Sequence, residues 1–97
     1  MQEQFETIGS FTTENAGKYL IQLCKHFGHK VPARIDGDRG QVTLQIGEAL
    51  LTADSSRLTA RLIAQDQDAI ARLQHIIDDH LKRFAFRETF MGIHWRA

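Results

Sequence analysis

The longest regular pattern of apolar residues lies between residues 66 and 88. Its apolar positions recur at intervals of three and four residues: Ile70, Leu73, Ile77, Leu81 and Phe84. This spacing places them on one face of an α-helix. Asp66 or Asp68 can accept the free backbone N–H groups at the start of that helix. Phe86 falls outside the apolar face, so either the helix ends before it or another segment covers it.

A second amphipathic helix is expected from Thr12 or Thr13, either of which can cap it, to residues 26–28. Its apolar face comprises Ala16, Tyr19, Leu20, Leu23 and Phe27. Cys24 flanks that face, and we interpret it as a small buried hydrophobic residue. Gly28 can adopt the left-handed conformation that commonly ends a helix.

The remaining segments alternate between apolar and polar residues with the period of two that is typical of β-strands. Strands are expected at residues 4–12, 31–36, 41–46 and 57–64, with a further short one at 49–53 after a bend or bulge at Gly47. Pro32 has no N–H to donate, so the strand at 31–36 should begin there or lie at a sheet edge. Residues 37–40 favour a turn, which makes the strands on either side a hairpin.

These elements predict a single α+β domain over residues 1–97. Their order is β-α-β-β-(β)-β-α, which gives a small antiparallel sheet of four to five strands with two amphipathic helices packed on one face. The other face should be mostly polar and exposed to solvent. Ile8, Leu50 and Ile63 fall on that outer face, either as scattered apolar residues or as a patch that binds a second copy of the chain.

The composition is that of an ordinary soluble globular domain. The chain has 12 basic and 12 acidic residues and no net charge, which argues against nonspecific binding to nucleic acid. Its single cysteine permits no intrachain disulfide and suits a reducing cytoplasm. The first ten residues lack the basic and apolar regions of a signal peptide, and no apolar stretch is long enough to span a membrane. We therefore expect a cytoplasmic protein with no membrane partner.

Histidines and basic residues gather near the ends of both predicted helices. They are Lys25, His26, His29 and Lys30 in one segment, and His80, Arg83 and Arg87 in the other. If the two segments meet, they form a basic cleft suited to an anionic ligand, because arginine pairs with carboxylates through two hydrogen bonds. The alternative is that the arginines pair with acidic neighbours or helix-terminal carbonyls and bind no ligand. We expect no metal site and no cofactor, because a lone His-x-x-His pair is a weak signature.

Two other classes of function stay open. His80 beside Arg83 could act as a general acid or base, but the sequence has no glycine-rich phosphate loop and no paired carboxylates in an apolar setting. Enzyme activity is therefore the less favoured hypothesis. The apolar tail at residues 89–97 could cover Phe86, add an edge strand or bind a partner through Trp95. Together with the outer sheet face, it suggests a homo-oligomeric or protein-interaction domain.

Two segments carry a family resemblance: residues 23–30, LCKHFGHK, and residues 80–88, HLKRFAFRE. With a tryptophan close to the C-terminus, they resemble the bacterial domain-of-unknown-function family numbered 2218, and the likeness covers essentially the whole chain. That family offers no catalytic residues to carry over. Its members resemble modules sometimes joined to flavin-dependent, siderophore-interacting ferric reductases, which implies a link to iron acquisition. We therefore expect a non-catalytic binding or accessory module, with a siderophore or haem as its anionic ligand or such a reductase as its partner.

Overall fold

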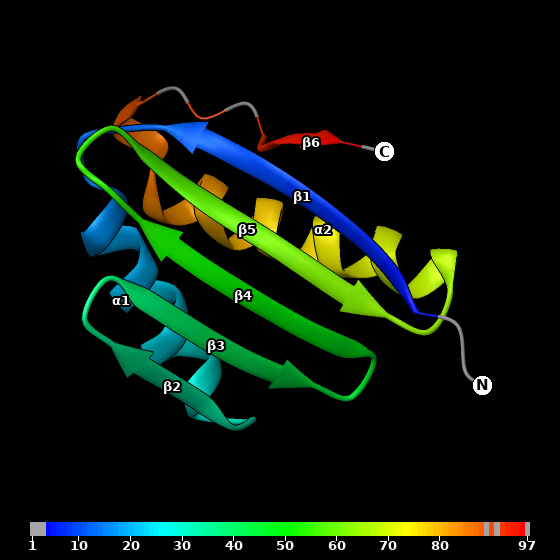
Figure 1. The fold of residues 1–97 in the computed structure, drawn as a ribbon. Helices are drawn as coiled ribbons and strands as arrows, with labels where there is room; N and C mark the ends of the chain where they lie inside the picture. The colour runs from blue at the N-terminus through cyan, green and yellow to red at the C-terminus, as the bar shows by residue number, and fades with distance from the viewer. Residues whose placement is uncertain (1–3, 89, 91, 97) are drawn as a thin grey trace.

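The computed structural model describes residues 4–88, 90 and 92–96, and they form one antiparallel sheet with two helices on one of its faces (Figure 1). The strands are β1 Phe5–Thr12, β2 Ala33–Asp36, β3 Arg39–Leu44, β4 Gly47–Ala53, β5 Arg57–Ala64 and β6 His94–Arg96. The helices are α1 Ala16–Gly28 and α2 Gln67–Phe84, followed by a 3-10 helix at Phe86–Glu88. The predicted α+β class with both helices on one face is confirmed.

The sheet is built from a local meander and two strands added to its side. β2, β3 and β4 each pair with the next strand along the chain. β1 then pairs with β5 along its whole length, from Phe5 opposite Ala64 to Thr12 opposite Arg57. The order is therefore β2-β3-β4-β5-β1-β6. β2 starts directly after Pro32 and lies at an edge of the sheet, as predicted from the lack of an N–H on Pro32.

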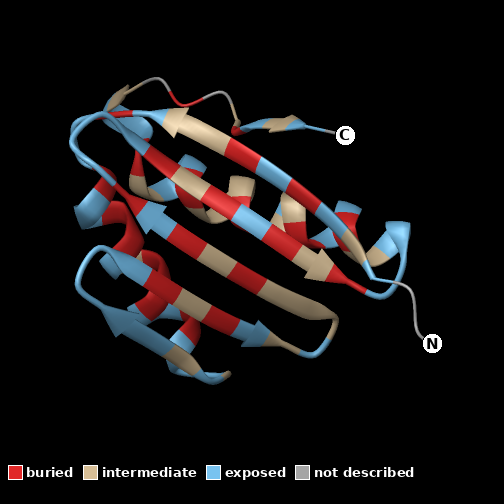
Figure 2. Cartoon of the chain, in the orientation of Figure 1, coloured by how far each residue is buried: buried red, intermediate tan, exposed pale blue. Residues whose placement is uncertain are grey.

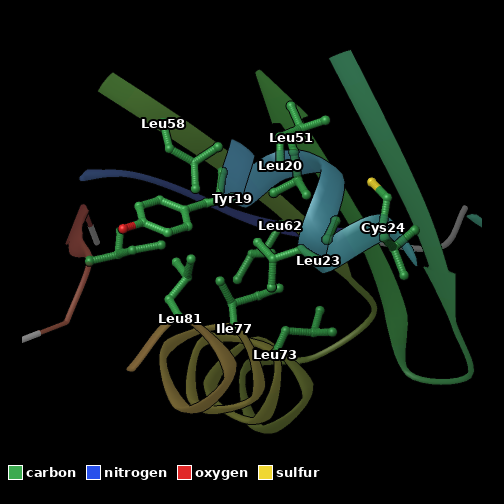
Figure 3. Packing of buried hydrophobic residues seen from close by; sticks show 14 of the residues in the cluster. Tyr19, Leu20, Leu23, Cys24, Leu51, Leu58, Leu62, Leu73, Ile77 and Leu81 are labelled. Carbon is green, nitrogen blue, oxygen red and sulfur yellow. The ribbon is translucent and has the colours of Figure 1, made fainter. Parts of the chain in front are cut away.

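The core lies between the helices and the inner face of the sheet. Figure 2 shows buried residues alternating with more exposed ones along the central strands, as expected when one face is covered. Figure 3 shows how side chains of both helices meet those of the sheet; Leu20, Leu23, Leu62, Ile77 and Leu81 have no exposed surface. Burial of each such side chain contributes about 1.5–3 kcal/mol before conformational entropy is subtracted. Cys24 is also buried, as predicted.

Helix α1 begins later than the sequence predicts, because β1 stays paired with β5 as far as Thr12. The helix starts at Ala16, and the preceding Asn15 makes no side-chain capping hydrogen bond. The hydroxyl of Thr13 accepts a hydrogen bond from the N–H of Asn15 at 3.0 Å and donates one to Glu88 at 2.6 Å. Thr13 therefore links two distant segments instead of capping the helix.

The predicted left-handed stop at Gly28 is wrong. Gly28 is helical, whereas Gly37 in the turn between β2 and β3 has a positive φ of 61°. The helix closes through the N–H groups of Lys30 and Val31, which both donate to the carbonyl of Phe27. These bonds satisfy the end of the helix without a left-handed residue.

Helix α2 begins where the sequence places it and ends earlier. The side chain of Asp66 accepts a hydrogen bond from the N–H of Ala69 at 2.7 Å, which confirms the predicted cap. The helix ends at Phe84, so the chain has left the helical path before Phe86. Phe86 is 68% exposed, and the guanidinium of Arg87 lies 5.6 Å from the centre of its ring.

The predicted count of four to five strands is too low by at least one, because the sheet has six. What the sequence suggested as a bend at Gly47 is a hairpin turn at residues 45–46, after which β4 returns alongside β3. The tail supplies the sixth strand, with Trp95 opposite Gly9 of β1. Thr89, Met91 and Ala97 of the predicted tail lie outside the described residues. No described helix has both the length and the apolar character that a membrane span requires.

Candidate functional site

The two segments that the sequence proposed as the sides of a basic cleft do meet. His26 in the last turns of α1 faces His80 on α2, with 3.1 Å between their Nε2 atoms. The two rings are tilted by 56° and their centres are 4.6 Å apart. His80 is partly buried and His26 is exposed, so the pair lies where the seam between the helices opens to solvent.

Neighbouring groups orient the pair. Nδ1 of His80 lies 2.7 Å from the carbonyl oxygen of Ile76, so this nitrogen carries the proton and donates it. The Nε2 of His80 is then a free acceptor, and His26 donates its Nε2–H to it. The ring of Phe27 lies 4.8 Å from that of His80, and Phe84 lies 6.0 Å from His26. Packing and backbone bonding therefore hold the two rings in contact.

The surroundings of the pair carry an excess of positive charge. Desolvation lowers the pKa of His26, and Coulombic interactions with His80, His29, Lys30 and Arg83 lower it further. All four interactions oppose protonation of His26. We call these five residues the basic cluster.

One exposed carboxylate offsets part of this charge. Asp79 lies 3.4 Å from the guanidinium of Arg83, one helical turn away on α2. Such an exposed pair contributes only about 0.3–0.5 kcal/mol, so it does not hold Arg83 away from a ligand. The predicted pairing of Arg83 with an acidic neighbour is therefore observed, and ligand binding by Arg83 stays a prediction.

An open hollow of about 410 Å³ shares His29 with the basic cluster. It is lined by Cys24, Lys25, Gly28, His29, Ala33 and Ile35. Ile35 is 42% exposed there and offers apolar surface next to the positive charge. Burial raises the pKa of the Cys24 thiol, so this cysteine is not an activated nucleophile.

Of the five predicted ligand-binding residues, the structure joins two directly and places two more in the same electrostatic environment. His26 and His80 are in contact, and the charges of His29 and Arg83 act on His26. Arg87 lies in the 3-10 helix beside Phe86. Among the described residues, no three His, Cys, Asp or Glu side chains lie close enough to hold a metal ion together.

A polar network around Glu88 was not anticipated. Its carboxylate accepts hydrogen bonds from Thr13 at 2.6 Å, from Asn15 at 3.0 Å and from the hydroxyl of Tyr19. Partial burial acts to raise the pKa of Glu88, but these hydrogen bonds and the charge of Lys18 outweigh it and lower the pKa. The network joins the C-terminal segment to the turn between β1 and α1. The residues of this network are far apart in the sequence, so no local sequence pattern predicts it.

The residues predicted to bind a partner fall in two places. Ile8, Leu50 and Ile63 lie on the outer sheet face, where Ile8 is 40% exposed. Arg61 is the register partner of both Ile8 and Leu50, and it forms two hydrogen bonds with Glu6 at 2.7 and 3.0 Å. A charged pair therefore separates the apolar residues. Binding of a second copy through this face stays a prediction.

Trp95 packs against its own chain. Its indole N–H donates to Asp78 of α2 at 3.0 Å, and the N–H of Ile93 donates to the same carboxylate at 2.9 Å. Of the roles that the sequence left open for the tail, the edge strand is the one observed. A partner-binding role for Trp95 stays a prediction.

The fold and this geometry define a small α+β domain with a basic, histidine-lined seam between two helices. The chain belongs to a family of uncharacterised proteins conserved in bacteria, DUF2218, whose model matches residues 9–96. It is similar to PA4090 from Pseudomonas aeruginosa, known from an NMR structure, with 32% identity, 95% of each chain covered and a TM-score of 0.80. A comparison with curated proteins gives no match. The resemblance drawn from residues 23–30 and 80–88 is thereby confirmed.

Proposed function

We propose that this domain is a non-catalytic binding module and that the basic cluster binds a small anionic ligand. The observation that carries the proposal is the gathering of three cationic or protonatable side chains, those of His29, Lys30 and Arg83, around the contact between His26 and His80. Placing like charges together costs free energy unless an anion binds among them. Guanidinium and imidazole groups also supply the charge-assisted hydrogen bonds that carboxylate or phenolate oxygens accept.

The adjoining hollow suggests the shape of the ligand. Ile35 and Ala33 offer apolar surface beside His29 and Lys25, so a ligand with negative groups and an apolar or aromatic body would contact both. Siderophores and haem have this character. They are the first candidates because of the link to iron acquisition that the family resemblance implies, and a siderophore-interacting ferric reductase is the first protein partner to test.

Binding is favoured over catalysis by the state of His80. Its Nδ1 is engaged with the carbonyl of Ile76, and its Nε2 accepts from His26. A general acid or base needs a ring nitrogen within reach of the reacting proton. His80 has no nitrogen free for that task while the pair is intact.

The test is an NMR titration of backbone amides with gallium-loaded siderophores, since gallium is a diamagnetic substitute for ferric iron. We expect saturable shifts at residues 25–30 and 80–84. Arg83→Gln should weaken binding by about tenfold, the loss of one hydrogen bond to a charged group. Lys82→Gln removes the same charge from the adjacent position and serves as the matched control. Absence of shifts at millimolar ligand, or equal weakening by both variants, would contradict the proposal.

A further inference from the structure

The contact between His26 and His80 has the spacing of two ligands on one metal ion. Their Nε2 atoms are 3.1 Å apart. Two imidazole nitrogens that each lie about 2.0–2.1 Å from one ion are separated by roughly 3.0–3.4 Å. An ion would therefore replace the shared proton if both rings turned so that their Nε2 lone pairs converged on it.

The surroundings of His80 match those of a metal-ligating histidine. Its Nδ1–H donates to the backbone carbonyl of Ile76 at 2.7 Å, which fixes the tautomer with an unprotonated Nε2 that can bind a metal once His26 no longer donates to it. Metal-binding histidines almost always donate their second ring N–H to a carbonyl or carboxylate in this way. Since that carbonyl belongs to the same helix, the orientation is built into α2.

The charges around the pair decide what kind of metal species fits. His29, Lys30 and Arg83 act against a bare divalent cation but attract a complex that is negative overall. Within the described chain no third His, Cys, Asp or Glu completes a protein site. Water or a chelator that arrives with the ion would fill the remaining coordination positions, and the surrounding positive charge favours an anionic chelator.

We propose that His26 and His80 together ligate a transition-metal ion held in an anionic chelate that leaves two adjacent coordination positions free. The proposal rests on the anion-binding function above and narrows its ligand class, because a chelator that saturates its metal leaves nothing for the histidines to bind. On binding, the proton on Nε2 of His26 passes through solvent to Nδ1 of the same ring. Both Nε2 lone pairs then displace two waters from the metal.

The experiment uses the chain without a histidine tag and three nickel probes. Nickel nitrilotriacetate is anionic and has two adjacent free positions. Nickel ethylenediaminetetraacetate is anionic with no two such positions, and aqueous nickel is a cation with all positions open. Calorimetry gives the affinities, and paramagnetic broadening of amide resonances locates the ion. We expect nickel nitrilotriacetate to bind at least about tenfold more tightly than either of the others and to broaden residues near 26 and 80.

Variants separate the two parts of the proposal. His26→Gln, which changes an exposed side chain, and His80→Gln should each weaken nickel nitrilotriacetate by more than about tenfold. His75→Gln on the exposed side of α2 should have no effect. Equal binding of the two anionic chelates would overturn metal ligation while leaving anion binding intact. Aqueous nickel binding as tightly as the nitrilotriacetate complex would overturn the anionic class and the proposed function with it.

Discussion

Replacing Tyr19 with phenylalanine tests the hydrogen-bond network around Glu88. Tyr19 is 4% exposed and its hydroxyl donates a hydrogen bond to Glu88. Burial, then this hydrogen bond and the negative charge of Glu88, raise the pKa of Tyr19 from 10.0 to about 12. Tyr19 is the only tyrosine in the chain, so its ionisation can be followed without overlap from another.

The sign and size of the effect follow from that pKa. Because the folded state holds the proton more tightly, the stabilisation is complete below pH 10 and is lost as the pH rises from 10 to about 12. A rise of two pKa units corresponds to at most ~3 kcal/mol, and solvent beside the exposed Asn15 reduces the expected value to about 1–2 kcal/mol. At pH 7, Tyr19→Phe should lose about 1–2 kcal/mol of unfolding free energy, mainly the hydrogen bond to a charged group.

The assay is urea unfolding of wild type and Tyr19→Phe from pH 7 to pH 12, with tyrosinate absorbance of the folded wild type as a second measurement. The difference between the two proteins isolates Tyr19, because lysines and other groups titrate equally in both. We expect the difference to shrink between pH 10 and 12 and the absorbance midpoint to lie near pH 12. Ionisation near pH 10 in the folded protein, or a difference that does not change with pH, would refute this reasoning.

Three further predictions concern the tail and the helix cap. Gly9→Ala should displace β6 and cost about 1–3 kcal/mol, because the added carbon would lie 2.6 Å from a ring carbon of Trp95. Tryptophan fluorescence of Gly9→Ala should shift to the red. Gly17→Ala is the control: a Cβ there would have no atom within 4 Å, so the change should be neutral or stabilise by about 0.5–1 kcal/mol. Asp78→Ala should cost about 1–3 kcal/mol and speed hydrogen exchange in β6; unchanged exchange would contradict it. Asp66→Ala should cost about 1 kcal/mol in urea unfolding through loss of the cap, and no loss would mean that water replaces it.

The apolar faces of both helices were predictable because helical periodicity alone determines which side chains share a face. Leu73, Ile77 and Leu81 are fully buried, as their spacing predicts. β6 was harder to predict, because a strand of three residues carries too little alternation. β6 can pair there because Gly9 has no side chain, which leaves room for Trp95. Such a contact between distant residues leaves no periodic signal.

The candidate site was predictable only in part for the same reason. Helical geometry places His80 at the border of the apolar face, and that border is where α1 packs. The contact with His26 then depends on how the two helices lie side by side, which no local pattern encodes. Glu88 is a stronger case, since the sequence indicates it only as one of the acidic neighbours with which an arginine could pair. Its partners Thr13 and Tyr19 come from the other end of the chain.

The two edges of the sheet affect the tendency of this chain to aggregate at high concentration. β2 has four residues, follows Pro32 and exposes Arg34, all of which discourage another strand from pairing with it. β6 has only three residues, yet it covers part of the free edge of β1, an eight-residue strand with three large apolar side chains. Release of β6 would uncover a template for intermolecular pairing. We therefore expect the hydrogen bond between Trp95 and Asp78 to protect the chain against aggregation, and its loss should appear as light scattering on gentle heating.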